Sequence, residues 1–284
     1  MSPSQSEAFL IAILRGVTVV AGAIVLCILG FLALEALPIL KKVHPIRFFI
    51  DPVWHPTEGA YGLMPMLIGS MLMTLGALLW SIPLGIASGV FSLFYAPRAL
   101  AAAYERMIAL LAGIPSVVYG LWGLVVLVPL IRKLHPPGPS LLAGMVILGF
   151  MVFPMIALSA SASFSNIPDE YVQSAAALGL SRWETVRGVM LPAARPGLAA
   201  GILLAAGRAI GETMAVLMVS GNVVQLPRSV FDPVRTLTAN IALEMAYAMD
   251  AHRAALFVCG LILMLAISVL VLTTERIRSH AAGH

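Results

Sequence analysis

The run GVTVVAGAIVLCILGFLAL, Gly16 to Leu34, contains no charged side chain and is bracketed by Arg15 and Glu35. A helix needs about 20 mostly apolar residues to cross a bilayer. Because no cleavage site follows a short apolar core, we expect this run to be a retained first span and not a signal peptide. Similar runs recur along the chain, so we predict an all-α polytopic membrane protein that forms a single transmembrane domain over residues 1–284. The six predicted transmembrane helices are residues 16–34, 65–94, 107–131, 141–163, 197–219 and 254–274.

The composition agrees with this fold class and excludes several functions. Of the 284 residues, 60% are hydrophobic and only 11% are charged, whereas soluble domains are usually near 25% charged. The two cysteines lie in apolar runs and the histidines lack metal-ligand spacing, so we expect no metal site. No phosphate-binding G-x-x-x-x-G-K-[ST] loop is present, so this chain is not expected to hydrolyse ATP by itself. A net charge of +4 spread over the whole chain is too small to indicate a nucleic-acid partner. We expect the apolar helices to contact membrane lipid.

Orientation does not follow from the charges. If both termini are cytoplasmic, the arginines and lysines divide equally between the two sides of the membrane. The excess of basic residues on the cytoplasmic side, which normally sets topology, is therefore missing.

The polar segment 164–196 between the fourth and fifth spans is predicted to contain two short helices. Gly179 suits the left-handed position that ends a helix, and a capping box opens the next helix at Ser181. We expect Leu191 and Pro192 to end that second helix. The residues leave two interpretations open: a helix pair that lies on the membrane surface, or a docking element for a cytoplasmic partner.

The stretch SAAALGLSRWETVRGVMLP, residues 174–192, resembles the "EAA" coupling loop of ABC-transporter permease subunits. Ser174 stands where many members have glutamate. The resemblance implies that the loop is cytoplasmic and fits a cleft on a separate ATPase subunit, which would carry the ATP and Mg²⁺, so that this chain needs no cofactor. The implied ATPase-coupling residues are Ala175, Ala176, Gly179, Leu191 and Pro192.

The fifth predicted span contains the charged run GRAIGETMAV, residues 207–216. Arg208 is expected roughly 16 Å deep, near the bilayer centre, and Glu212 lies four residues on, where a helix would pair the two side chains. Either the pair pins helix packing, or Arg208 contacts a cargo, since a guanidinium matches a tetrahedral oxyanion. We expect Thr213 to add a hydroxyl donor and Asn222 to line the outer mouth of the same substrate pathway.

The run 207–216 closely resembles the fifth span of phosphate-specific ABC permeases. The motifs that favour the C type of the two paralogous permeases are Trp54 and Pro56 before Tyr61-Gly62, Ile82–Gly85 and Gly113–Gly120. The resemblance implies a type I ABC importer permease with both termini cytoplasmic in a bacterial inner membrane. It implies a transport subunit that forms half of the translocation pathway, and not an enzyme. The implied partners are an A-type permease, two ATPase subunits and a periplasmic phosphate-binding protein.

Two alternatives stay open at this point. The cargo is another tetrahedral oxyanion, such as phosphonate, sulfate or molybdate, or the chain is a stand-alone carrier in which Glu212 relays protons. Many secondary carriers are built from inverted repeats, and none is evident here.

Overall fold

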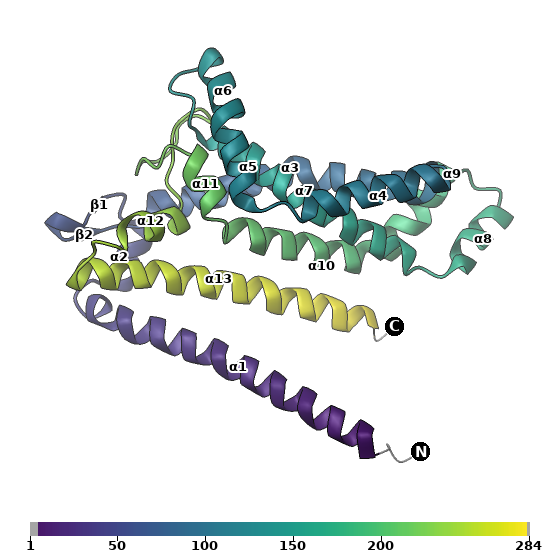
Figure 1. The fold of residues 1–284 in the computed structure, drawn as a ribbon, viewed down its shortest axis with the longest axis horizontal. Helices are drawn as coiled ribbons and strands as arrows, with labels where there is room; N and C mark the ends of the chain where they lie inside the picture. Colours follow the sequence, from purple (N-terminus) through teal and green to yellow (C-terminus); the bar gives the residue numbers. More distant parts are fainter. Residues whose placement is uncertain (1–4, 283–284) are drawn as a thin grey trace.

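The computed structural model describes residues 5–282 of the chain and is almost entirely helical (Figure 1). Within that range, six helical segments are long and apolar enough to cross a membrane, which confirms the predicted number of spans. They cover Phe9–Leu40, Met64–Tyr95, Ser116–Leu134, Leu141–Ser165, Arg182–Ile210 and Asp250–Ile277. Residues 1–4 and 283–284 of the predicted single domain lie outside the described residues.

Most elements follow one another with short connections, and the long exception is residues 220–236 between Val219 and Leu237. The helices are α1 Gln5–Leu40, α2 Pro45–Ile50, α3 Met64–Val90, α4 Arg98–Ala112, α5 Ser116–Trp122, α6 Val128–Leu134, α7 Leu141–Ser165, α8 Asp169–Ala177, α9 Arg182–Thr185, α10 Leu191–Ile210, α11 Met214–Val219, α12 Leu237–Glu244 and α13 Asp250–Ala282. Strands β1 Trp54–His55 and β2 Ala60–Tyr61 pair antiparallel around a 3-10 turn at Pro56–Glu58. Wider π-helical turns occur at Phe91–Tyr95, Gly123–Leu127 and Val186–Met190.

The centre of the bundle is the close packing of α3 against α7. A side chain at Gly149 of α7 would overlap the indole of Trp80 on α3, and one at Gly85 of α3 would lie 2.6 Å from Ile156 Cγ2 on α7. Small residues let membrane helices approach closely enough for van der Waals packing, which replaces the hydrophobic effect inside a lipid bilayer. The absence of these side chains therefore fixes how α3 and α7 meet, and α10 packs on the same pair.

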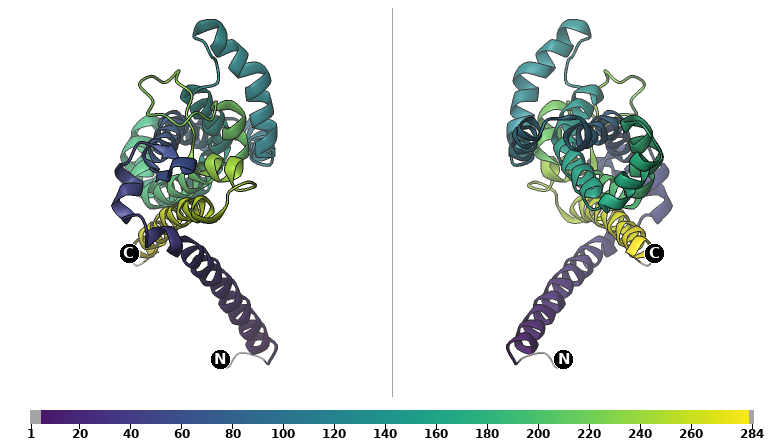
Figure 2. Two further views of the ribbon diagram at one scale, coloured as in Figure 1. Left: turned by 90° about the vertical axis from the view of Figure 1, so that its left-hand side faces the viewer. Right: turned by 90° about the vertical axis from the view of Figure 1, so that its right-hand side faces the viewer.

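Helix α1 is joined to the bundle only near its C-terminal half. It packs on α13, and Arg253 lies 3.8 Å from Glu35. Toward its N-terminus α1 diverges from the rest of the chain (Figures 1 and 2), and apolar side chains such as Val19 and Leu26 are each 70% exposed. An apolar surface of this size indicates contact with lipid or with another subunit.

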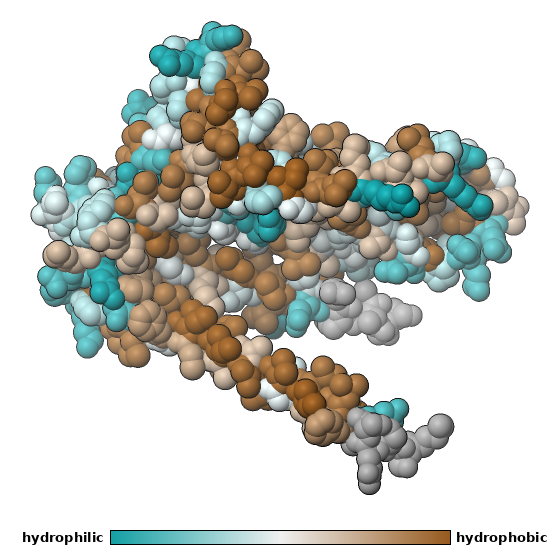
Figure 3. Space-filling model, viewed as in Figure 1, coloured by the Kyte–Doolittle hydropathy of each residue, from teal (hydrophilic) through white to brown (hydrophobic). Residues whose placement is uncertain are grey.

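The two ends of the bundle carry different elements. The beginning of α1, the end of α13, α8 and α9 lie together at one end, whereas α2, the β-hairpin and α12 lie at the other (Figure 1). Helix α6 projects from the bundle nearer the second end (Figure 1). Figure 3 shows hydrophilic side chains gathered over both ends and the tip of α6, with an apolar surface between them. This distribution is the one expected of a protein that spans a bilayer.

The third predicted span is placed differently by the structure. Helix α4 ends at Ala112 and α5 begins at Ser116, so no single helix covers residues 107–131. Pro115 has no amide hydrogen to continue the helix, and the residue before a proline is disfavoured in the helical region. The membrane-spanning segment accordingly starts at Ser116 and extends to Leu134.

The fifth predicted span, 197–219, is also shifted. One helical segment runs from Arg182 to Ile210, and it breaks before α11. Leu191 and Pro192 do not end the preceding helix as predicted, because they begin α10 without interruption. The π-helical turn at Val186–Met190 lets the Leu191 amide bond the Val186 carbonyl, and such a widened turn accommodates a proline that lacks its own donor. Most of the predicted coupling loop 164–196 is therefore helical, with short non-helical connections before and after α8.

Candidate functional site

The charged run of the fifth span lies at a helix break. Helix α10 ends at Ile210, Gly211 follows as its C-cap, and α11 begins at Met214. The Glu212 carboxylate accepts a hydrogen bond from the backbone amide of Ala215 at 3.2 Å. An acidic side chain in this position satisfies one of the amides left unpaired at a helix N-terminus. Glu212 therefore caps α11.

The predicted pairing of Arg208 with Glu212 is not formed. The prediction assumed a continuous helix, in which residues four apart share a face, but the helix ends two residues after Arg208. Within residues 5–282 no ion pair joins the two side chains. The break turns the Glu212 side chain toward the start of α11 instead.

The Arg208 guanidinium points away from the packed interior of this chain. Arg208 is exposed between the buried residues Ala205 and Ala209, and Leu204 and Gly211 on the same face are also exposed. No hydrogen bond or ion pair to the guanidinium is formed anywhere in the described part of the chain. An arginine within a membrane helix faces the interior of an assembly or a water-filled cavity, because lipid does not solvate its charge. The exposed face therefore marks a polar space outside this chain.

Helix α5 borders the same region. The hydroxyl of Tyr119 donates to the Leu111 carbonyl at 2.9 Å, across the break between α4 and α5, and Tyr119 lies within electrostatic range of Arg208. Helix α5 also packs against α11, where a Cβ at Gly120 would lie 2.8 Å from the Cα of Ala215, so the helices that follow the breaks at 113–115 and 211–213 lie side by side. Breaks in membrane helices are tolerated where they line a cavity or are covered by protein.

Thr213 and Asn222 lie beyond opposite ends of α11, whose six residues are about 9 Å long. The Thr213 hydroxyl is half-buried and lies 3.4 Å from the Gly211 carbonyl. Asn222 adopts a positive φ of 54° and donates from Nδ2 to the Leu217 carbonyl at 2.8 Å. The structure thus brings Thr213 close to the break but uses the amide of Asn222 to close the far end of α11.

The predicted coupling residues fall into two groups. Ala176 and Gly179 are exposed on α8 and on the turn that follows it, and Gly179 has the left-handed φ of 73° that its position in the sequence predicted. Ala175 is only 2% exposed, and Leu191 and Pro192 are half-buried within the continuous helical segment. Only the first group is therefore available to a partner.

The turn between α8 and α10 is locally well fixed. The Ser181 hydroxyl accepts the Glu184 amide at 3.3 Å, and the Glu184 carboxylate accepts the Ser181 amide at 2.8 Å, which confirms the predicted capping box. Around it, the apolar side chains of Tyr171, Leu178 and Trp183 are half or more exposed. Exposed apolar side chains clustered among polar ones are typical of a surface that contacts another protein or the membrane.

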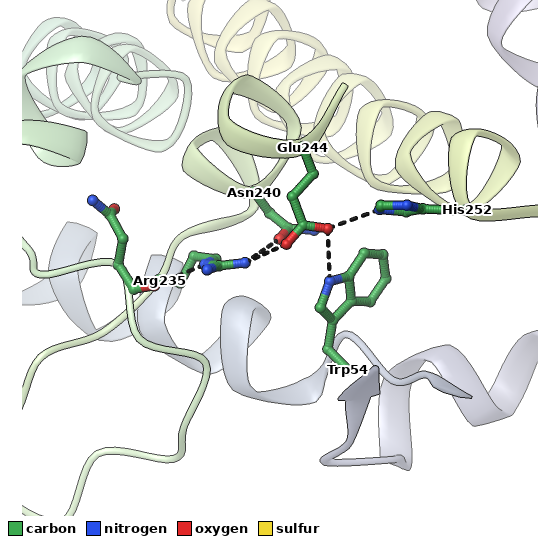
Figure 4. A network of polar contacts seen from close by, with 6 residues as sticks. Trp54, Arg235, Asn240, Glu244 and His252 are labelled. Atoms are coloured by element: carbon green, nitrogen blue, oxygen red, sulfur yellow. Dashed lines mark hydrogen bonds and ion pairs between the residues drawn. The ribbon is translucent and has the colours of Figure 1, made fainter. Parts of the chain in front are cut away.

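A second polar cluster, at the opposite end of the bundle, was not predicted from the sequence. The carboxylate of Glu244, whose side chain is 9% exposed, accepts three hydrogen bonds (Figure 4). Oε1 accepts from Arg235 Nη1 at 2.6 Å, and Oε2 accepts from the Trp54 indole at 3.0 Å and contacts His252 Nε2 at 2.8 Å. Because an ionised carboxylate only accepts, His252 Nε2 must carry the hydrogen.

We call Trp54, Arg235, Asn240, Glu244 and His252 the Glu244 cluster. Arg235 also donates from Nη1 to Asn240 Oδ1 at 3.1 Å and from Nε to the Asn222 carbonyl at 2.9 Å. A glutamate among apolar residues in the run LTANIALEMA, residues 237–246, was the available sequence signal. Its partners come from β1, the segment before α12 and the start of α13, and no sequence pattern places those together.

Comparison with known proteins decides the family. Residues 81–278 match the family model described as "Binding-protein-dependent transport system inner membrane component". The chain belongs to this family. It is therefore a multi-pass subunit of the inner membrane in an ABC transport system, a transport component and not an enzyme.

Curated relatives are similar over most of this permease subunit. The "Phosphate transport system permease protein PstC" of Mesorhizobium japonicum is 33% identical over 290 residues, which cover 93% of this chain and 88% of that protein. The "Probable ABC transporter permease protein YqgH" of Bacillus subtilis is 38% identical over 235 residues, which cover 81% of this chain and 76% of that protein.

Solved structures share the fold at low sequence identity. A chain of a bacterial alginate ABC transporter, crystallised with an alginate-bound periplasmic protein, superposes with a TM-score of 0.64 and 13% identity, covering 94% of this chain and 93% of that chain. A chain of the methionine ABC transporter MetNI gives a TM-score of 0.59 with 19% identity, covering 81% of this chain and 99% of that chain. The permease subunit therefore has the type I ABC importer fold that the sequence predicted.

Proposed function

We propose that this permease subunit forms half of the translocation pathway of an ATP-driven, binding-protein-dependent importer of inorganic phosphate. The observation that carries the proposal is the Arg208 guanidinium, which is exposed at a helix break and has no partner among the described side chains. Relatives that are similar over most of the chain are phosphate permeases by name, which supports phosphate over other tetrahedral oxyanions.

Arg208 is the residue that binds the anion in this proposal. Its planar guanidinium presents parallel donors that match two oxygens of a phosphate. Because Glu212 is held by the Ala215 amide, its carboxylate does not occupy those donors. Thr213, at the same break, is placed to add a hydroxyl donor. Asn222 would act at the outer mouth by holding the end of α11 and not by contacting phosphate directly.

Coupling to ATP hydrolysis would use the exposed residues Ala176 and Gly179. From Arg182 the chain continues as one helical segment to Ile210, so the loop and Arg208 are joined over roughly 40 Å at 1.5 Å per residue. A displacement of the loop by an ATPase subunit would therefore move the helix that carries the guanidinium. Ala175, Leu191 and Pro192 would hold the loop on this helix by packing.

The full importer would contain an A-type permease as the second half of the pathway, two ATPase subunits with ATP and Mg²⁺, and a periplasmic phosphate-binding protein. Helices α8 and α9 lie at the same end as the beginning of α1 and the end of α13 (Figure 1). If the ATPase subunits dock on α8, both termini are cytoplasmic and the Glu244 cluster faces the periplasm. The exposed face around Arg208 would then be closed by the A-type permease.

The test is uptake of radioactive phosphate by proteoliposomes that contain the complete complex. Arg208→Ala should abolish uptake with assembly intact, and Arg208→Lys should transport poorly because an ammonium lacks the planar fork. Arg228→Ala, which changes an exposed arginine of the loop before α12, is the matched control and should transport normally. Wild-type uptake by the Lys variant would refute the bidentate role of Arg208.

The same vesicles separate the alternatives. A phosphate importer of this class requires internal ATP, is insensitive to a collapsed proton gradient, and is not inhibited by excess sulfate or molybdate. Uptake that follows the proton gradient without ATP would instead indicate a proton-coupled carrier.

A further inference from the structure

The Glu244 cluster and the helix break beside Arg208 are joined by one short helix. Helix α12 runs from Leu237 to Glu244, a rise of about 1.5 Å per residue. At its beginning the Thr238 hydroxyl donates to the Glu212 carbonyl at 2.8 Å. At its end Glu244 holds the cluster (Figure 4). A rigid element of about 10 Å thus connects the two sites.

The beginning of α12 is fixed on the bundle as well as on the break. The Leu237 amide donates to the Ser70 hydroxyl of α3 at 3.0 Å. Just before it, the Arg235 carbonyl lies so close to Gly69 that a Cβ there would be 2.9 Å away. The Glu212 carbonyl would otherwise lack a helical partner, because the helix is interrupted at that point. The Thr238 hydroxyl supplies the missing donor and so holds the break in place.

The end of α12 depends on one carboxylate. Both oxygens of Glu244 are used, and their three donors come from β1, from the segment before α12 and from α13. Asn240, one turn earlier, is fully buried and accepts from the same Arg235 nitrogen. A buried carboxylate that loses its charge leaves its cationic partner uncompensated, which is more disruptive than the loss of a surface pair.

We propose that Glu244 is a positioning residue for the Arg208 site, and that α12 is the strut through which it acts. Glu244 fixes one end of α12 to the β-hairpin and to α13. The other end, through Thr238, then holds the backbone at Glu212 and with it the orientation of the last turn of α10. The inference rests on the proposed function for its effect on transport, but the mechanical link itself can be measured without phosphate.

The primary measurement is hydrogen–deuterium exchange of the complete complex in lipid nanodiscs. Glu244→Gln keeps the size of the side chain, but its amide group faces donors that need an acceptor. Exchange at residues 211–217 should become about tenfold faster as the local hydrogen bonds open more often. Exchange at the buried α3–α7 contact should not change. Glu58→Gln, the same substitution at an exposed site on the same end of the bundle, is the control and should leave residues 211–217 unaffected.

A second variant shows whether faster exchange in Glu244→Gln comes from the link through α12 or from misfolding of the Glu244 cluster. Thr238→Val is close in shape and removes the hydroxyl that donates to the Glu212 carbonyl and also contacts the Thr236 hydroxyl at 3.1 Å, at the opposite end of α12 from Glu244. It should also accelerate exchange at residues 211–217. Unchanged exchange there in either assembled variant, or an equal change in Glu58→Gln, would overturn the proposal.

Uptake separates this inference from the proposed function. If α12 positions Arg208 for transport, both variants lower the maximal phosphate uptake rate about tenfold, as expected for a misplaced binding group, with KM for the loaded binding protein nearly unchanged. Faster exchange at residues 211–217 with normal uptake would support the mechanical link through α12. It would count against the proposal that phosphate passes along the Arg208 site. Unchanged exchange rejects the strut whatever the uptake.

Discussion

The sharpest prediction concerns Gly179, in the turn after α8. Its φ of 73° lies in the left-handed region, and apart from its two sequence neighbours no atom of residues 5–282 lies within 4 Å of where a Cβ would be. A side chain at this position therefore meets nothing in the permease subunit itself. Any effect beyond backbone strain must come from a partner, so we expect Gly179→Asn to weaken attachment of the ATPase subunits.

The free-energy cost of placing a side chain at the positive φ of Gly179 can be estimated, and a control variant can carry the same cost. An ordinary L-residue in the left-handed region costs roughly 1–2 kcal/mol, and asparagine visits this region more readily than other side chains. Gly59 provides the control, because its φ is 76°, its Cβ position is equally open, and it lies in the hairpin at the other end of the bundle. Gly59→Asn and Gly179→Asn should therefore lower thermal stability by similar small amounts.

The assay compares the two variants in the purified complex. We expect Gly179→Asn to retain less ATPase subunit through purification in mild detergent, and to show ATP hydrolysis that no longer drives uptake. Gly59→Asn should retain the ATPase subunits at the wild-type level. Normal retention and coupled transport in Gly179→Asn would refute the placement of Gly179 under a partner. Equal loss in both variants would show that strain alone is responsible.

Two further predictions concern packing and pH. Gly149→Val should destabilise the protein by about 1–3 kcal/mol or prevent assembly, because the added carbons overlap Trp80; Gly22→Val, at an open site on α1, should have little effect on thermal stability. Asp232 accepts the amides of residues 228–229 at 2.8 and 2.9 Å, and these hydrogen bonds hold the pKa of its carboxyl below the usual range. The contribution of Asp232 to loop order should therefore be complete above the ordinary aspartate pKa of about 3.9 and lost as pH falls through the lowered pKa. Exchange rates of the two amides measured against pH test this, and Asp232→Asn should remove that pH dependence.

The spans and the capping box could be predicted because they depend on residues that are neighbours in the sequence. Hydrophobicity over about 20 residues decides whether a helix enters the bilayer, and the Ser181 box needs only four consecutive positions. The prediction was wrong at Pro192, where the sequence signal for a helix end is genuine. A π-helical turn just before it removes the conflict, and that turn has no recognisable sequence pattern.

The candidate site was only partly predictable, for a similar reason. Arg208 stands out as a charge within an apolar run, but its pairing with Glu212 assumed that the helix continues through Gly211. The structure ends α10 there and gives the carboxylate of Glu212 to the Ala215 amide. Whether a glycine in a membrane helix is a packing contact or a helix end depends on the neighbouring elements, which sequence spacing does not specify.

The sequence by itself determined that this chain is a six-span membrane protein, that two short helices joined by a capped turn lie between the fourth and fifth spans, and that one arginine lies within a predicted span. Each of these properties depends on residues that are close together in the sequence. Only the tertiary structure decided that the arginine is unpaired at a break, and that Glu244 joins Trp54 of a hairpin 190 residues earlier to α13. A buried carboxylate needs donors from whichever segments packing brings to it, and packing between distant helices is a property of the whole bundle.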